Sequence, residues 1–159
     1  MVELRQERGH VAVRRLLDDR LHAFNQAAIG DAGFSRLTLT VRNRGRIVGG
    51  LAAEIYFGWM FVVALWIAEK HRGKKHGTAL IERAEAVARE RGARNVWLDT
   101  FAFQAEGFYR KLGYRPFGRL DDYPPGHSRI WLTKALSKCP TPNPAQQPGN
   151  PPPNHSNGR

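Results

Sequence analysis

The clearest pattern of hydrophobic and polar residues lies in the middle of the chain. Residues 61–67 are all apolar, which predicts a strand buried on both faces. After a short basic stretch, apolar residues recur at helical spacing and predict an amphipathic helix, in which Glu85 can pair with Arg89 and which Gly92 can cap. The apolar stripe of this helix consists of Leu80, Ile81, Ala84, Val87 and Ala88.

Apolar runs and alternations predict five more strands. Two pair as a hairpin around a turn at 43–45, two form a second hairpin near the end, and one follows the central helix. A strand, helix and strand in succession over this length predict a parallel pair with a right-handed crossover. The predicted strands are residues 37–41, 47–53, 95–98, 114–120 and 128–136.

Helical spacing also predicts a first helix through residues 13–24 and a short one through 105–112 that Gly113 closes. We expect the first helix to cover or flank the sheet. The predicted class is therefore α+β, with a mixed, mostly antiparallel central sheet and helices on both of its faces.

Composition divides the chain in two. With 159 residues, 42% hydrophobic residues, four Trp and eight Phe, it can bury one core, which we assign to residues 1–136. From residue 137 onward seven of the ten prolines occur and apolar residues almost vanish, which predicts a disordered tail over 137–159. A single cysteine, Cys139, excludes an internal disulfide, and the six His show no metal-ligand spacing, so we expect no metal.

The formal net charge is +11, which makes a polyanionic partner worth testing. The basic residues are spread along the chain and interleaved with acids, which argues against a nucleic-acid-binding surface. No apolar run approaches the roughly 20 residues that span a bilayer, and the N-terminus lacks the apolar core of a secretory signal. We therefore expect no membrane partner and a cytoplasmic location.

A basic loop joins the central strand to the helix that follows it. The backbone N–H groups at a helix N-terminus, together with the helix dipole, attract an anion such as a phosphate. A solvated basic turn is an equally good interpretation of the loop alone. The loop consists of Arg72, Gly73, Lys74, Lys75, His76 and Gly77.

In this order the elements resemble the GNAT superfamily of acyl-CoA-dependent N-acetyltransferases, over roughly residues 2–136. Residues 72–77 resemble the family's Arg/Gln-x-x-Gly-x-Gly/Ala loop, and residues 105–114 resemble its A-x-x-x-Y-x-K-x-G-F/Y segment. Lys75 departs from the loop's middle glycine. Ala102 stands where the family often has asparagine, and we expect Gln104 to take over part of that role.

The resemblance implies acetyl-CoA as co-substrate and a primary amine of a small molecule, peptide or protein as acceptor, with direct attack in a ternary complex. It places the pantetheine arm on the backbone of Leu65, Trp66 and Ile67, the pyrophosphate on the loop and Thr78, and the general acid at Tyr109. A homodimer is compatible with the sequence.

The sequence leaves several candidates for the general base, and two alternatives to an enzyme. An amine with a pKa near 10.4 is almost entirely protonated at pH 7, a penalty of roughly 4.6 kcal/mol that a base must offset. The candidate bases are Glu54, Asp99, Asp121, Asp122 and His127. The alternatives to an enzyme are a non-catalytic module that binds acyl-CoA and, with less support, a basic nucleic-acid-binding protein.

Overall fold

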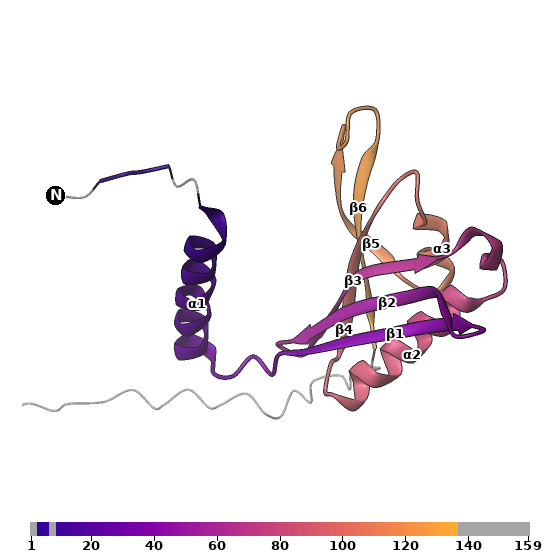
Figure 1. Ribbon diagram of the computed structural model, residues 1–159, viewed down its shortest axis with the longest axis horizontal. Coiled ribbons are helices and arrows are strands. Elements are labelled where there is room, and N and C mark those ends of the chain that lie inside the picture. Colours follow the sequence, from indigo (N-terminus) through magenta and orange to yellow (C-terminus); the bar gives the residue numbers. More distant parts are fainter. Residues whose placement is uncertain (1–2, 7–8, 137–159) are drawn as a thin grey trace, which may run out of the picture.

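The computed structural model describes residues 3–6 and 9–136. Its six-stranded sheet has the order β1-β2-β3-β4-β6-β5, in which only β3 and β4 run parallel, so the predicted class is confirmed (Figure 1). The predicted tail and Cys139 lie outside the described residues. The elements are α1 (His10–Ile29), β1 (Ser35–Asn43), β2 (Arg46–Tyr56), β3 (Trp59–Ile67), η1 (Glu69–His71), α2 (His76–Glu90), β4 (Asn95–Phe101), α3 (Glu106–Lys111), β5 (Arg115–Asp121) and β6 (Ser128–Ala135).

The first three strands form an antiparallel meander. The predicted turn between β1 and β2 is present, and both of its central residues, Arg44 and Gly45, have positive φ, as a tight hairpin turn requires. On β2, Gly49 and Gly50 lie where neighbouring strands approach closely. A Cβ on Gly49 would meet the Ile67 side chain at 2.5 Å, and one on Gly50 would meet the Leu39 carbonyl oxygen at 3.0 Å.

The parallel pair is short. β3 and β4 stay in register over only four residue pairs, from Trp59 opposite Asn95 to Val62 opposite Leu98. At this point the β2–β3 register shifts, which leaves Val63 as an extra residue in β3. A bulge of this kind increases local twist and bends the strand. Beyond it, β3 continues along β2 while β4 continues along β6, and the two strands diverge.

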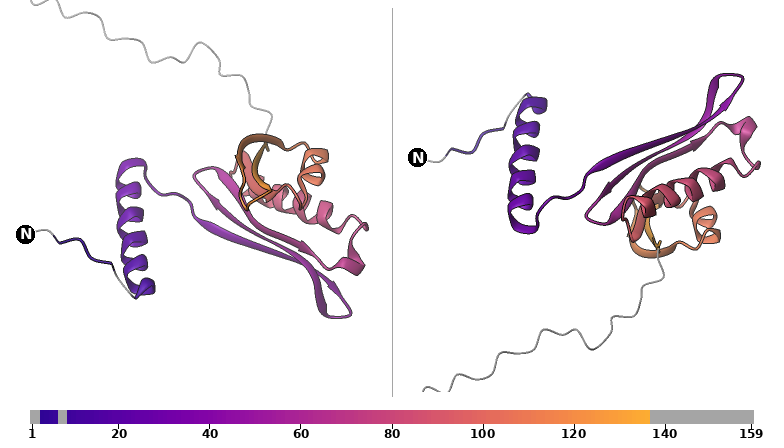
Figure 2. Two further views of the ribbon diagram at one scale, coloured as in Figure 1. Left: turned by 90° about the horizontal axis from the view of Figure 1, so that it is seen from above. Right: turned by 90° about the horizontal axis from the view of Figure 1, so that it is seen from below.

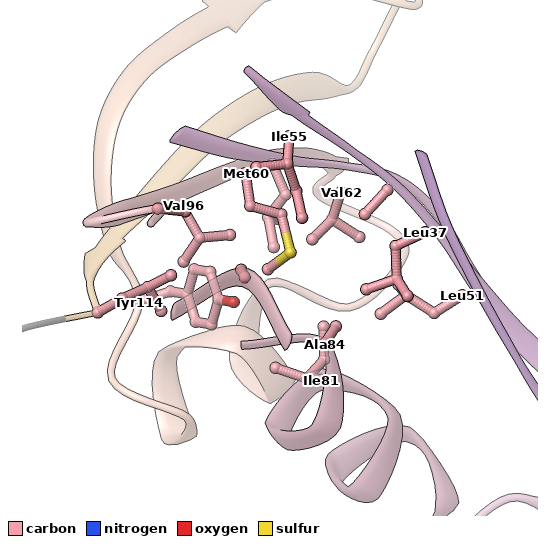
Figure 3. Close-up of a cluster of buried hydrophobic side chains, with 14 of the residues drawn as sticks. Leu37, Leu51, Ile55, Met60, Val62, Ile81, Ala84, Val96 and Tyr114 are labelled. Atoms are coloured by element: carbon pink, nitrogen blue, oxygen red, sulfur yellow. The ribbon is translucent and has the colours of Figure 1, made fainter. Parts of the chain in front are cut away.

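The hydrophobic core lies between one face of the sheet and α2. Met60, Val62 and Val96 from the sheet meet Ile81 and the neighbouring apolar positions of α2, and Tyr114 closes the cluster (Figure 3). Helix α3 packs on this same face, since a Cβ on Gly77 of α2 would lie 3.3 Å from the Phe108 ring. Both helices thus cover one face, which corrects the prediction of helices on both faces (Figure 2).

The opposite face of the sheet is open in the described part of the chain. Val63 and Trp66 of β3 are 50% and 55% exposed, so the prediction of a strand buried on both faces is wrong. A continuous apolar run could not reveal this, because the outward residues of β3 are apolar as well.

A cluster around the buried carboxylate of Glu85 joins α2 to Tyr114, just before β5, and to Lys134 on β6. Glu85 is 3% exposed and accepts hydrogen bonds from the Lys134 ammonium at 2.8 Å and from the Tyr114 hydroxyl at 3.0 Å. The predicted pairing with Arg89 is confirmed at 3.4 Å. Burial, followed by the charge of Glu85, raises the pKa of Tyr114, so this phenol stays protonated and donates.

Helix α1 stands apart from the sheet (Figures 1 and 2). Its predicted apolar stripe is present but open, with Leu16 53% and Phe24 70% exposed, so the prediction that it covers the sheet is wrong. The segment after it is anchored, because the Ala32 carbonyl accepts the Phe57 N–H at 2.7 Å. No helix among residues 3–6 and 9–136 is both long and apolar enough to cross a bilayer.

Candidate active site

The divergence of β3 and β4 opens a cleft with two adjoining halves. One half lies between the two strands and includes Asp99, Phe101 and Gln104; the other lies over the N-terminus of α2. The same five residues line both halves, which makes the cleft continuous. They are Leu65, Ile67, Arg72, Ala105 and Tyr109.

The N-terminus of α2 forms the basic end of the cleft. Gly73 and Lys75 have φ of 73° and 61°, and the left-handed turn at Lys75 brings the chain into the helix. Arg72 fixes the start of the loop by donating from Nε to the Ile67 carbonyl at 3.1 Å. Within the described part of the chain, the N–H groups of His76, Gly77 and Thr78 make no hydrogen bond. They are the free donors that an anion can bind.

The predicted loop residues gather here, with one exception. Arg72, Gly73, Lys75, His76, Gly77 and Thr78 all line the basic end, and Leu65 and Ile67 border it. Trp66 lines the other half, and Lys74 lines neither. Three residues that line the basic end, His71, Ala105 and Phe108, were not predicted as site residues. In the sequence, Phe108 is one position of an apolar helical stripe, and such a position cannot be distinguished from an ordinary core residue.

Tyr109 lies where the two halves of the cleft join. It is 7% exposed, and burial, followed by the negative charge of Asp99, raises its pKa to about 12. The phenol is therefore protonated at neutral pH and can donate a hydrogen bond. Its ring packs at 5.1 Å from Phe108 and 5.8 Å from Tyr114, so it is a core aromatic as well as a lining residue.

Asp99 is the carboxylate of this cleft. It is the first residue of β4 beyond the last pair with β3, which places it where the strands part. Arg129 on β6 donates from Nε to Asp99 Oδ2 at 2.6 Å, and this hydrogen bond raises the pKa of Arg129. The guanidinium also lies 5.4 Å from the Phe101 ring, 5.8 Å from Tyr123 and 5.5 Å from Trp131.

The other candidate bases do not line the cleft. Glu54 lies 3.6 Å from Arg36 in a separate hollow beside α1, and Asp121 is exposed and paired with Arg119 at 2.6 Å. Asp122 accepts the Gly126 N–H at 2.7 Å within the β5–β6 turn. His127 lies near the cleft, with its ring 4.9 Å from that of Phe103. The geometry therefore favours Asp99 as the general base. The sequence alone could not rank the five candidates, because Asp99 stands out only through its position where β4 diverges from β3.

Gln104, which the sequence predicts to lie near the pantetheine arm, lines the half that contains Asp99. Its side-chain carbonyl accepts the Phe101 N–H at 3.0 Å and lies 3.2 Å from the Thr100 hydroxyl. This oxygen is therefore occupied in fixing the loop after β4, and only the amide NH₂ can reach a ligand. In the described residues no three His, Cys, Asp or Glu side chains gather as a metal site would require.

Comparison with known proteins identifies the scaffold. Residues 2–114 match the model of the acetyltransferase (GNAT) family. The chain is 41% identical over 100 residues to the blasticidin-S acetyltransferase of Streptomyces morookaense, a match that covers 62% of this chain and 74% of that protein. It is 32% identical over 121 residues to acetyltransferase Atu2258 of Agrobacterium fabrum, covering 76% of this chain and 88% of the relative.

A solved structure agrees with the fold. The 1.9 Å crystal structure of an acetyltransferase from Bacillus cereus superposes with a TM-score of 0.77 at 31% identity, over 83% of this chain and 97% of its own. The family match, the two relatives and the diverging parallel strands lead to one conclusion: the chain belongs to the GNAT family of acetyltransferases.

Proposed function

We propose that this protein transfers an acetyl group from acetyl-CoA to a primary amine of a small molecule. The observation that carries the proposal is the continuous cleft, which connects the free N–H groups of α2 to Asp99 by way of Tyr109. One end suits a pyrophosphate and the other a cationic amine. The name of the S. morookaense relative supports a small-molecule acceptor over a protein.

The chain's residues fit the co-substrate at the basic end. The N–H groups of residues 76–78 bind the pyrophosphate oxygens, and the helix dipole adds to their attraction. Lys75 and Arg72 add positive charge. Beyond Val62, the edge of β3 that faces β4 has no partner strand among the described residues, so its backbone groups at Leu65 and Ile67 can bind the pantetheine amides.

In the reaction, Asp99 accepts a proton from the acceptor's ammonium group, directly or through a water molecule. The neutral nitrogen attacks the thioester carbonyl carbon, and a C–N bond forms. The C–S bond then breaks, the nitrogen gives up its second proton to solvent, and the leaving sulfur takes up a proton. The products are an amide and CoA thiol. Deprotonating the amine at pH 7 costs roughly 4.6 kcal/mol, and the main task of the general base is to offset this cost. A carboxylate in a partly enclosed cleft is suited to that task.

Tyr109 assists the leaving sulfur. Full proton transfer from a phenol of pKa about 12 to a thiolate of pKa about 8.5 is uphill by about 5 kcal/mol. Tyr109 therefore acts first as a hydrogen-bond donor to the sulfur while negative charge develops there, and solvent restores any proton that it gives up. This role needs a protonated phenol, which the raised pKa ensures.

Two measurements test the proposal. Acetyl-CoA should raise the melting temperature of the protein, whereas acetate should not, because the loop binds the pyrophosphate. Release of CoA thiol in the presence of a panel of primary amines distinguishes the enzyme from a non-catalytic acyl-CoA-binding module. No thermal shift at millimolar acetyl-CoA would refute the assignment of the loop, and a shift without thiol release would favour the binding module.

A further inference from the structure

Two aromatic rings, Phe101 and Phe103, line the end of the cleft where Asp99 is found, and two more pack against them. Phe101 and Phe103 stack in parallel, with centroids 5.3 Å apart and planes 3° apart, and Tyr123 and His127 pack against them at 6.2 Å and 4.9 Å. Phe103 and Tyr123 are nevertheless 57% and 48% exposed. Exposed rings gathered at the mouth of a cleft are typical of a ligand-binding wall.

The loop after β4, which carries Phe103, is held by hydrogen bonds in which no aromatic side chain takes part. The Ala102 N–H donates to the Ser128 carbonyl at 2.8 Å, and the Gln104 N–H donates to the Phe101 carbonyl at 2.9 Å. The Gln104 side chain adds the bond to the Phe101 N–H at 3.0 Å. Backbone bonds thus fix the loop after β4, and the side chain of Phe103 is available for another purpose.

The same corner already binds a flat cation. The Arg129 guanidinium lies within 6 Å of three ring centroids and donates to Asp99 Oδ2. Aromatic faces attract cations, and a carboxylate can accept several hydrogen bonds, so this donor leaves Asp99 with capacity for a second one. An ammonium group at Asp99 would share this half of the cleft with the rings of Phe101 and Phe103, which line it as well.

We propose that the acceptor is a cationic amine attached to a planar aromatic or heteroaromatic ring, an inference that rests on the proposed acetyl transfer. The ring packs on Phe103 and Tyr123 at the mouth of the cleft, and the amine reaches Asp99. The wall therefore determines specificity. An aliphatic amine of equal length and basicity fills the same space but lacks the flat, polarisable face that stacks on a ring.

The test compares two probe amines, 2-phenylethylamine and 2-cyclohexylethylamine, which differ mainly in planarity. Their dissociation constants are measured by calorimetry in the presence of CoA, where no acetyl group is available, so that turnover is not required. We expect the phenyl compound to bind about three- to tenfold more tightly, the range typical of one stacked pair. Equal binding, or tighter binding of the cyclohexyl compound, would overturn the inference.

Two variants assign the preference to the wall. Phe103→Leu keeps apolar bulk but removes the flat face, and it should abolish the preference, while Phe103→Trp should keep it. The matched control is Phe117→Leu, because Phe117 is as exposed but lines a different hollow beside Trp59 and Trp97. A preference that survives in Phe103→Leu, or that is lost in Phe117→Leu, contradicts the proposal.

The acetyl-CoA thermal shift separates this inference from the function on which it rests. If acetyl-CoA stabilises the protein and amines are acetylated without preference for a ring, the transferase remains and the aromatic acceptor is refuted. If acetyl-CoA gives neither a shift nor thiol release, both fail together.

Discussion

Lys75 offers the sharpest test of the loop, because its backbone and its side chain act in opposite directions. The residue has φ of 61°, in the left-handed region, and precedes the first turn of α2. A non-glycine residue costs about 1–2 kcal/mol in this region. Lys75→Gly relieves that cost, while the greater freedom of glycine in the unfolded chain removes about 0.4–1 kcal/mol of the gain.

The net expectation is that apo Lys75→Gly is more stable by about 0.5–1 kcal/mol, which for a domain of this size raises the melting temperature by roughly 2–4 °C. Acetyl-CoA affinity should fall by about tenfold, or roughly 1.4 kcal/mol, because one cation beside the phosphates is lost while the N–H groups remain. Melting curves with and without acetyl-CoA, together with a binding titration, measure both effects.

Arg44→Gly is the matched control. Arg44 is also a cation with positive φ, at 46°, but it lies in the β1–β2 turn and does not line the cleft. This variant should gain similar stability and keep its acetyl-CoA affinity. If Lys75→Gly loses both stability and affinity, the backbone argument is wrong; a loss of a thousandfold or more in affinity would make Lys75 the principal ligand of the phosphates.

Four other predictions follow from the site and the core. Asp99→Asn should lower kcat/KM at least a hundredfold and leave the acetyl-CoA thermal shift unchanged, whereas Glu54→Gln should keep its activity; equal losses would refute Asp99 as the base. Tyr109→Phe should lower kcat at least tenfold. Because the folded pKa of about 12 lies above the unfolded value near 10, the stability of the wild type should decline as pH rises between them, and less so in this variant, as denaturant titrations would measure. Lys134→Met should cost about 3–5 kcal/mol of unfolding free energy because Glu85 loses its main cation, with the exposed Lys111→Met as control. Truncation after Leu136 should leave folding and acetyl-CoA affinity intact; a truncated protein that melts earlier would show that the tail docks.

Local chemistry made most of the fold predictable. The apolar spacing of α2 fixed its buried face, and the turn at Arg44 and Gly45 fixed the first hairpin. The same reasoning failed for α1, since an apolar stripe shows that a helix has a face to bury but not what covers it. The apolar run of β3 likewise predicted burial of both faces, although its outer face is exposed.

The candidate site was predictable where neighbouring residues form it. Residues 72–78 are contiguous, so the succession of strand, turn and helix predicted without tertiary information that they gather at a helix N-terminus, and most of them line the basic end of the cleft. Asp99 could not be selected from the four carboxylates and one imidazole that were candidates, because its position depends on where β3 and β4 part and on Arg129, thirty residues further along the chain. Tyr123 was equally hidden, because it packs against Phe101 only from the β5–β6 turn, which is distant in the sequence from the end of β4.

The four-pair contact between β3 and β4 has a mechanical consequence. Most strand-to-strand bonding lies within two blocks, β1–β3 and β4–β6, and the short parallel ladder from Trp59 to Val62 is the seam between them. A ligand whose amides form hydrogen bonds with the free edge of β3, beyond the point where β3 and β4 diverge, would stabilise this seam. Amide hydrogen exchange at the edges of β3 and β4 should therefore slow on acetyl-CoA binding more than exchange within either block. On the proposed binding mode, the co-substrate also supplies backbone hydrogen bonds that β3 and β4 do not make to each other beyond Val62.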